Sequence, residues 1–336
     1  MSQDQKAIVV NGLRKSYEPV IAVDGVSFQV EAGEIFGMVG PNGSGKTTTI
    51  ECIEGLRQPD EGEISVLGLD PNKDVYELRE RTGIQLQAAN LPRRMRVEEA
   101  LDLFTSFYRQ TRDWRPLMAG LGLEDKRRAY FSQLSGGQKQ RLFVALALVN
   151  QPEVVFLDEL TTGLDPRARH NIWDLVREIR EQGTTIFLTT HYMDEAERLC
   201  DRVAILDHGR MIALDTPAQL VNKLGMATRI TFQVNGGRTV KRNNGGERDS
   251  TAAFDAAQVG VLDGVQRVEK EGDQVTVYGQ GAQLIGAVIN TLETGGVQIH
   301  NLRTEQADLE DVFLALTGRE VENSQLSKMG NLDWRK

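Results

Sequence analysis

The sequence predicts an α/β fold with a mainly parallel sheet, followed by a small α+β domain. Three observations lead to this prediction. A glycine-rich loop at 40–47 lies between an apolar strand and a helix. An apolar strand at 154–157 ends in two carboxylates. After residue 225, short strands and helices follow in β-α-β-β-α-β order, which is typical of a ferredoxin-like domain.

The glycine-rich loop matches the phosphate-binding pattern G-x-x-x-x-G-K-[ST]. The strand expected at 34–39 and the helix expected from 47 to 54 supply the required strand–loop–helix context, in which backbone N–H groups and the helix N-terminus face an anion. These features predict the core of a P-loop NTPase that binds ATP and Mg²⁺. We expect Lys46 to contact the β- and γ-phosphates and Thr47 to bind Mg²⁺. The loop residues expected to bind the nucleotide are Gly40, Pro41, Asn42, Gly43, Ser44, Gly45, Lys46, Thr47 and Thr48.

The strand at 154–157 is apolar throughout, as in a central strand of a parallel sheet. Asp158 and Glu159 follow at its carboxyl end, where open α/β sheets bind ligands. We expect Asp158 to hold Mg²⁺, directly or through water. Glu159 is placed to polarise the water that attacks the γ-phosphate. This pattern is weak alone and becomes specific with the phosphate loop upstream.

From about residue 7 to 225, the chain resembles the nucleotide-binding subunits of ATP-binding-cassette (ABC) transporters. The motifs that carry the resemblance, in the family's order, are the glycine loop, Gly83–Gln87, Leu134–Gln138, Val154–Glu159, Leu164–Asp165 and His191. The alternation of apolar and polar residues from 7 to about 35 predicts an antiparallel β layer beside the nucleotide. The resemblance also implies a helical subdomain at about 88–150 that meets a membrane subunit. Within it, apolar residues at 97–108 recur at close to 3.6-residue spacing, which predicts a helix there.

The same resemblance implies a role for each matched residue. Tyr17 would stack on adenine, and Gln87 would contact Mg²⁺ or the attacking water. His191 would steady the γ-phosphate, and Asp165 would contact a second copy of the chain. The signature residues would close on the γ-phosphate that this second copy holds: Ser135, Gly136, Gly137 and Gln138. The signature also precedes an expected helix, whose dipole would favour an anion.

Several of these assignments have simpler alternatives. Tyr17 could be an ordinary half-buried tyrosine, and Gln85 competes with Gln87, although the spacing from Gly83 favours Gln87. A single histidine is usually structural, but the position of His191 after a strand favours catalysis. The family usually has proline where this chain has Leu160. We expect this change to affect only the geometry of the loop, because proline fixes φ and lacks an N–H group.

The expected domain order is an N-terminal tail at 1–6, the nucleotide-binding domain at 7–225, an accessory or dimerisation domain at 226–318 and a polar tail at 319–336. Residues 235–250 are rich in Gly, Asn and charge, which predicts a long exposed loop. The segments His191–Glu197 and Leu309–Phe313 resemble the ATPase subunits of daunorubicin-resistance-type (ABC-2 type) exporters. That resemblance implies a homodimer that hydrolyses ATP for a separate permease, which would export a drug, lipid or similar cargo.

Composition limits the remaining functions. The formal net charge of -9 argues against a nucleic-acid partner, which would favour a basic face. The two cysteines, expected within helices, form no metal-spaced cluster. No run reaches the ~18 apolar residues of a membrane-spanning helix, and residues 1–6 lack the apolar core of a secretory signal. We therefore expect a peripheral protein on the cytoplasmic face of the membrane. Two alternatives stay open: a soluble ABC ATPase of DNA repair or translation, and a scaffold that binds ATP without useful turnover.

Overall fold

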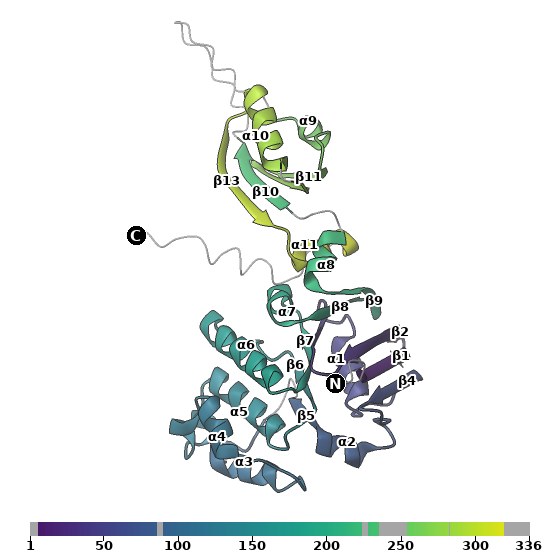
Figure 1. Cartoon of the computed structure of the whole chain (residues 1–336), viewed down its shortest axis with the longest axis vertical. Helices are drawn as coiled ribbons and strands as arrows, with labels where there is room; N and C mark the ends of the chain where they lie inside the picture. Colours follow the sequence, from purple (N-terminus) through teal and green to yellow (C-terminus); the bar gives the residue numbers. More distant parts are fainter. Residues whose placement is uncertain (1–5, 86–89, 224–227, 235–253, 282, 319–336) are drawn as a thin grey trace, which may run out of the picture. The chain divides into compact units, whose positions relative to one another are not determined.

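The computed structural model describes residues 6–85, 90–223, 228–234, 254–281 and 283–318. They form two compact units, the first ending at Pro217 and the second beginning at Ala218 (Figure 1). The sequence analysis placed this boundary at 225. The expectations for Gln87, the loop at 235–250 and the tail at 319–336 lie outside the described residues.

A six-stranded sheet forms the centre of the first unit. Its strands, in spatial order, are β5 (Thr82–Gln85), β6 (Val154–Asp158), β7 (Thr185–Thr190), β3 (Ile35–Val39), β8 (Arg202–Asp207) and β9 (Arg210–Asp215). All neighbours are parallel except β8 and β9. Carboxyl ends of parallel strands share one edge of a sheet. The residues that follow β3, β6 and β7 therefore meet at this edge.

A second, antiparallel sheet contains β2 (Val20–Glu31), β1 (Lys6–Tyr17) and β4 (Glu61–Val66), in that order. It is the β layer predicted from the alternating pattern. Helix α1 (Lys46–Ile53) contributes Ile50 and Ile53 to a core that includes residues of both sheets. Phe28 of β2 stacks on Phe36 of β3, with 5.1 Å between ring centroids. This shared core fixes the glycine loop between the two sheets.

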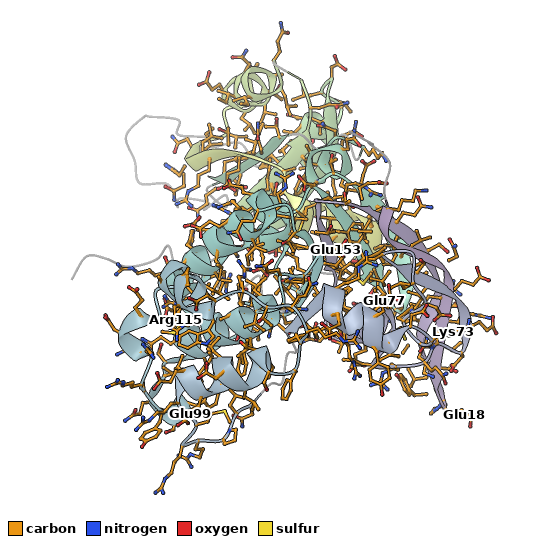
Figure 2. The ribbon with its side chains drawn as sticks, turned by 60° about the horizontal axis from the view of Figure 1, so that its bottom comes forward. Glu18, Lys73, Glu77, Glu99, Arg115 and Glu153 are labelled. Carbon is orange, nitrogen blue, oxygen red and sulfur yellow. The ribbon has the colours of Figure 1, made fainter. Side chains whose placement is uncertain are left out.

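The helices of the first unit include α2 (Val75–Arg81), α3 (Val97–Thr105), α4 (Trp114–Gly120), α5 (Gly136–Leu148), α6 (Pro166–Glu181) and α7 (Met193–Leu199). Two short 3₁₀ turns, Glu124–Lys126 and Phe131–Gln133, precede α5. Helices α3, α4 and α5 lie together (Figure 1), with Glu99 and Arg115 projecting outward from α3 and α4 (Figure 2). A Cβ on Gly83 would lie 1.9 Å from the carbonyl oxygen of Ala147, so glycine lets α5 approach β5 closely.

The second unit has the predicted ferredoxin-like order. Its elements are α8 (Pro217–Lys223), which starts at the boundary, β10 (Thr228–Val234), α9 (Ala256–Gly260), β11 (Val265–Glu271), β12 (Gln274–Gly279), α10 (Leu284–Thr294), β13 (Ile299–Gln306) and α11 (Leu309–Thr317). The sheet order is β11-β12-β10-β13, and every pair is antiparallel. Its own core joins Ile230, Phe232 and Val277 to Leu284 and Val288 of α10.

Candidate active site

The glycine loop connects β3 to α1 in a conformation that only glycine tolerates at two positions. Gly40 has φ 157° and Gly45 has φ 102°. A Cβ on Gly40 would lie 2.2 Å from the carbonyl oxygen of Leu206, and one on Gly45 would lie 2.4 Å from that of Ala22. The pattern glycines are thus required both by backbone conformation and by close packing.

Lys46 is buried at the start of α1, with its ammonium group turned toward the loop. Its Nζ donates to the carbonyl oxygens of Gly40 at 2.9 Å and Pro41 at 3.1 Å. Burial lowers the pKa of Lys46, and the charges of Glu159 and Asp158 oppose this. A bound phosphate would oppose it further, because a nearby anion favours the charged ammonium.

The buried hydroxyl of Ser44 has no hydrogen-bond partner among the described residues. A buried hydroxyl without a partner costs free energy, which a ligand oxygen can remove. Together with the loop and Lys46, it fits a phosphate group. Asn42 and Gly43 are exposed at the tip of the loop, and Thr47 and Thr48 are half-buried in α1.

An exposed apolar patch lies at the end of the β1–β2 hairpin. Tyr17 pairs with Val20 across the hairpin, and the exposed fractions of Tyr17, Val20 and Ile21 are 40%, 60% and 55%. The next residue, Ala22, contacts the glycine loop at Gly45. The patch therefore lies near the glycine loop, where Tyr17 is expected to stack on a base. The sequence analysis missed Val20 and Ile21, although their apolar side chains beside Tyr17 in a hairpin were a usable signal.

Asp158 lies at the carboxyl end of β6, where Thr189 of β7 donates a hydrogen bond from Oγ1 to its Oδ1. Burial raises the pKa of Asp158, and this hydrogen bond opposes the shift. The Asp158 carboxylate and the Thr47 hydroxyl are oxygen donors of the kind that Mg²⁺ accepts. Thr189 was missed by the sequence analysis, because only the strand pairing places it beside Asp158.

Glu159 is the centre of a buried polar group. Its Oε1 lies 3.4 Å from His191 Nδ1 and 3.8 Å from Lys46 Nζ, and its Oε2 accepts from Thr162 Oγ1 at 3.2 Å. The interaction with His191 is the main cause that lowers the pKa of Glu159. The carboxylate is therefore charged at neutral pH, as a general base requires. The structure thus brings together Lys46, Glu159 and His191, as expected.

The signature residues are not part of this group. Ser135 is the N-cap of α5: its Oγ accepts from the Gln138 N–H at 3.3 Å, and Gln138 Oε1 accepts from the Ser135 N–H at 3.0 Å. Ser135 and Gly136 are exposed. In the part of the chain that the structure describes, no hydrogen bond or ion pair joins the signature to the glycine loop. Asp165 caps α6 in the same way, accepting from the Ala168 N–H at 2.9 Å.

The other residues considered in the sequence analysis are the two glutamines after Gly83, Leu160 and the two cysteines. Gln85 is buried at the end of β5, and Gln87 is not among the described residues, so the choice between them stays open. Leu160 is buried. Cys52 lies in α1 as expected, whereas Cys200 follows the end of α7 and is not inside a helix. Burial raises the pKa of both thiols, that of Cys52 to about 11.

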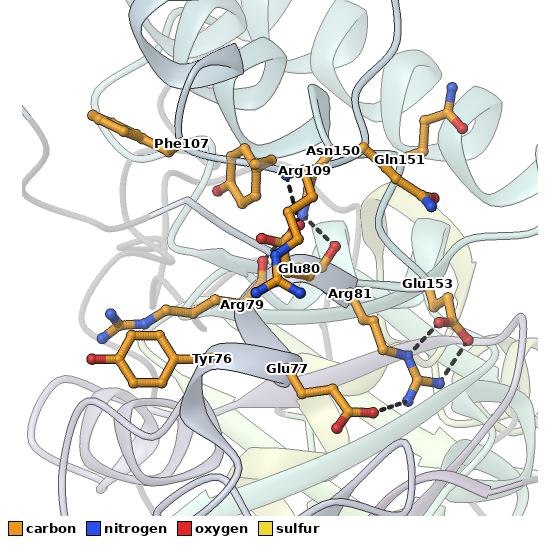
Figure 3. A pocket seen from close by; sticks show the side chains of 12 residues that line it. Tyr76, Glu77, Arg79, Glu80, Arg81, Phe107, Arg109, Asn150, Gln151 and Glu153 are labelled. Atoms are coloured by element: carbon orange, nitrogen blue, oxygen red, sulfur yellow. Dashed lines mark hydrogen bonds and ion pairs between the residues drawn. The ribbon is translucent and has the colours of Figure 1, made fainter.

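A groove of 1010 Å³ lies between α2 and the helical region (Figure 3). Two aromatic side chains on its rim are strongly exposed, Tyr76 by 86% and Phe107 by 61%. Arg81 pairs with Glu153 at 2.6 Å inside the groove. Other lining residues are Glu77, Arg79, Glu80, Tyr108, Arg109, Gln110, Asn150 and Gln151. Within the described ranges, the guanidinium groups of Arg79 and Arg109 have no ion-pair or hydrogen-bond partner.

Comparison with known proteins identifies relatives of nearly the same length. A "Nod factor export ATP-binding protein I" of Burkholderia pseudomallei (strain K96243) is 39% identical over 315 residues, covering 92% of this chain and 96% of the relative. The protein of the same name from Sinorhizobium fredii (strain NBRC 101917 / NGR234) is 37% identical over 327 residues, covering 96% and 89%.

Solved structures agree with these relatives. An ATP-binding subunit of an ABC transporter has a TM-score of 0.60 at 30% identity, covering 65% of this chain and 93% of its own. A dimeric ATP-binding cassette in a post-hydrolysis state, bound to ADP and phosphate, has a TM-score of 0.56 at 25% identity, covering 62% and 98%. The ABC transporter family model matches residues 23–162. The chain therefore belongs to the ABC transporter family, as an ATP-binding subunit that hydrolyses ATP.

Proposed function

We propose that this ATPase works as a head-to-tail pair with a separate permease and powers export across a membrane. The relatives named for Nod factor export, which align over most of their length, support export. Among the described residues, no helix has both the length and the apolar character needed to span a bilayer. In this proposal the membrane path belongs to the permease, and this subunit binds to it at the cytoplasmic face.

The position of the signature is the observation that carries the proposal of a pair. Ser135 and Gly136 are exposed at the N-terminus of the 13-residue helix α5. A helix N-terminus favours an anion, yet among the described residues no hydrogen bond or ion pair joins this one to the phosphate loop of its own chain. The site around Lys46 and Glu159 would therefore be completed by the signature of a second copy. The related cassette that was solved as a dimer with ADP and phosphate is consistent with such a pair.

In the proposed reaction, Lys46 and the loop N–H groups hold the phosphates of ATP, and Tyr17 stacks on the base. Mg²⁺ would be held by Thr47 and Asp158, with Gln87 as a further oxygen donor, and when bound it neutralises phosphate charge. Glu159 accepts a proton from the attacking water. His191, beside Glu159, orients this carboxylate and faces the γ-phosphate. The chemistry is mainly positioning and charge stabilisation, so pairing sets the rate.

The test is the substitution Glu159→Gln, which keeps the shape of the side chain and removes the base. We expect this variant to bind ATP, to accumulate as an ATP-bound dimer in size-exclusion chromatography and to lose phosphate release. Lys46→Ala is the control, because it should neither bind ATP nor dimerise with it. Normal turnover by Glu159→Gln would overturn the role of Glu159, and a strictly monomeric active enzyme would overturn the pair.

The groove beside α2 is the proposed docking place for a cytoplasmic segment of the permease. Its exposed aromatics Tyr76 and Phe107 offer apolar contact, and the unpaired guanidinium groups of Arg79 and Arg109 favour a segment with carboxylates. The double substitution Arg79→Glu with Arg109→Glu should weaken co-purification with the permease and leave basal ATPase activity unchanged. Arg115→Glu, on the exposed face of α4 (Figure 2), is the matched control. Equal co-purification of both variants would exclude the groove.

A further inference from the structure

Tyr192 lies between His191 and Arg169, an arginine of α6. The Tyr192 ring and the His191 ring have centroids 4.1 Å apart, at an interplanar angle of 40°. The guanidinium carbon of Arg169 lies 4.0 Å from the centroid of the Tyr192 ring. His191 Nδ1 lies in turn 3.4 Å from Glu159 Oε1. These contacts form a continuous series from α6 to the catalytic carboxylate.

Arg169 has few other interactions that could hold it. Its Nε is buried without a hydrogen-bond partner among the described residues, and its NH1 group lies 3.7 Å from Asp194 Oδ2. Its main contact among the described residues is therefore the face of the Tyr192 ring. Arginine suits this contact, because the planar guanidinium stacks on an aromatic face and is weakly hydrated.

Arg169 also belongs to the first turns of the helix that carries Asp165. Its N–H donates to the Asp165 carbonyl oxygen at 3.0 Å. The same helix is fixed to α7 by a buried hydrogen bond, 2.9 Å from Trp173 Nε1 to Glu195 Oε1. Thr190, which precedes His191, also interacts with the Glu195 carboxyl. A shift of α6 would therefore reach the His191 loop through packed, buried groups.

We propose that Tyr192 is a positioning residue that sets the orientation of the His191 ring, and that Arg169 couples this orientation to the Asp165 end of α6. The inference rests on the proposed function, in which Asp165 contacts the second copy and His191 acts beside Glu159. Pairing of two copies would then align His191 with Glu159 through the Arg169–Tyr192 stack. Neither Tyr192 nor Arg169 touches the reacting atoms.

The test compares four substitutions. Tyr192→Phe keeps the ring, Tyr192→Ala removes it, and Arg169→Met keeps the length of the side chain but removes the planar cation. Arg167→Met is the control, because Arg167 is exposed on the same helix. We expect Tyr192→Ala and Arg169→Met to lower kcat by roughly tenfold or more with KM for ATP almost unchanged, since misplacement of a catalytic group affects the rate. Tyr192→Phe and Arg167→Met should behave as the wild type.

A second readout follows the His191 ring itself. The chain has four histidines, so the His191 ring signals can be assigned in NMR spectra with a His191→Ala variant. The Tyr192 ring current should shift these signals, and the shift should survive in Tyr192→Phe, change in Arg169→Met and disappear in Tyr192→Ala. A purely structural role would lower thermal stability without changing the His191 signals of the folded protein.

The outcomes separate this inference from the proposed function. If Glu159→Gln is inactive while Tyr192→Ala and Arg169→Met keep the wild-type kcat, only the positioning role is overturned. Unchanged His191 signals in Arg169→Met overturn the coupling. If Tyr192→Ala does not fold, the kcat values and the His191 signals of Arg169→Met and Tyr192→Phe still test the positioning role. Normal turnover by Glu159→Gln, in contrast, removes the proposed function on which the inference rests.

Discussion

At the scale of single residues, two glutamates near α1 have opposite environments. Glu159 lies beside His191 and accepts a hydrogen bond from Thr162, and the pKa of its carboxyl is lowered chiefly by His191. Glu54, just after α1, has both carboxyl oxygens buried without a hydrogen-bond partner in the described ranges. Burial, with smaller effects of Asp158 and Glu51, raises the pKa of Glu54 to about 9. Glu54 is therefore an uncharged acid at neutral pH.

This difference predicts how stability depends on pH. The unfolded pKa of a glutamate is about 4.3, so the folded chain binds one proton more than the unfolded chain between about 4.3 and 9. The Glu54 contribution is fully present below the unfolded pKa and is lost as the pH rises through the folded pKa. The loss amounts to up to about 1.4 kcal/mol per pH unit. Glu54→Gln should remove this slope and stabilise the protein at alkaline pH.

Urea unfolding at about pH 6 and about pH 8.5 measures this effect, because the difference between the two free energies of unfolding gives the pH slope. The exposed Glu77 (Figure 2) provides the control Glu77→Gln, which should keep the wild-type slope. Equal slopes for Glu54→Gln and the wild type would contradict the assignment of a neutral Glu54.

The candidate catalytic residues could be proposed from the sequence because each follows a strand or loop with its own local pattern. Lys46, Glu159 and His191 meet because β3, β6 and β7 are parallel neighbours. The contact of Tyr192 with Arg169 could not be predicted, because it depends on how α6 packs beside α7. Local periodicity also does not reveal the buried carboxyl group of Glu54, since α1 packs into a core that both sheets share.

At the scale of elements, the start of α5 has room for small side chains within its own chain. A Cβ on Gly136 would lie 3.8 Å from Leu164 Cδ2, and one on Gly137 would lie 3.5 Å from Ala168 Cβ. These are ordinary contacts, so the isolated chain can accept alanine at both positions. In the proposed pair, the missing side chains at Gly136 and Gly137 let the ATP of the second copy approach the start of α5.

We therefore expect Gly137→Ala to fold normally and to lose ATP-dependent pairing and turnover. The free energy of unfolding should change by no more than about ±0.5 kcal/mol, as is typical of neutral substitutions, while phosphate release falls strongly. Gly120→Ala at the end of α4, where no atom lies within 4 Å of an added Cβ, is the matched control and should stay active. A destabilised, fully active Gly137→Ala would show that the glycine serves local packing instead.

In the second unit, a buried ion pair connects β10 to α11. Arg229 NH1 lies 3.1 Å from Asp311 Oδ1, and Arg229 also bonds Glu305 of β13. Burial raises the pKa of Asp311, and the charge of Arg229 opposes this. Removing only Arg229 would leave a buried carboxylate without its partner, which typically costs about 3–5 kcal/mol.

Arg229→Met should therefore destabilise the second unit by several kcal/mol, measured by denaturant unfolding. Adding Asp311→Asn should recover part of this loss, because the amide keeps an oxygen that accepts from the Asp308 N–H and carries no charge. No recovery in the double variant would mean that Arg229 acts by packing alone.

Element boundaries were harder to predict than the elements. The helix expected at 97–108 ends at Thr105, where Ser106 Oγ donates back to the Leu103 carbonyl oxygen at 2.6 Å. Such local side-chain bonds compete with helix continuation. The apolar spacing of Phe104 and Phe107 suggested a longer helix, but these rings contact each other at 5.6 Å around the helix end. The order of the strands in the six-stranded sheet could not be predicted from the sequence, because the crossover connections decide which strands pair.

At the scale of the whole chain, each unit has its own hydrophobic core. The first core joins both sheets and α1, and the second joins β10 and β12 to α9 and α10. The groups proposed to bind ATP, from Tyr17 to His191, all belong to the first unit. Cores without shared residues can unfold separately, since stability is not uniform across a structure.

Calorimetry should then resolve two unfolding transitions, and ATP with Mg²⁺ should raise only one of them. A ligand that binds the native state stabilises it by about 2.7 kcal/mol at a concentration 100 times its Kd. This gain should appear in the transition of the first unit, because the groups proposed to bind ATP all lie there. Lys46→Ala should abolish the shift, whereas Arg229→Met should lower the other transition and leave the shift intact. A single transition that moves as a whole with ATP would mean that the two cores unfold as one cooperative body, and the nucleotide would then control the second unit through its stability.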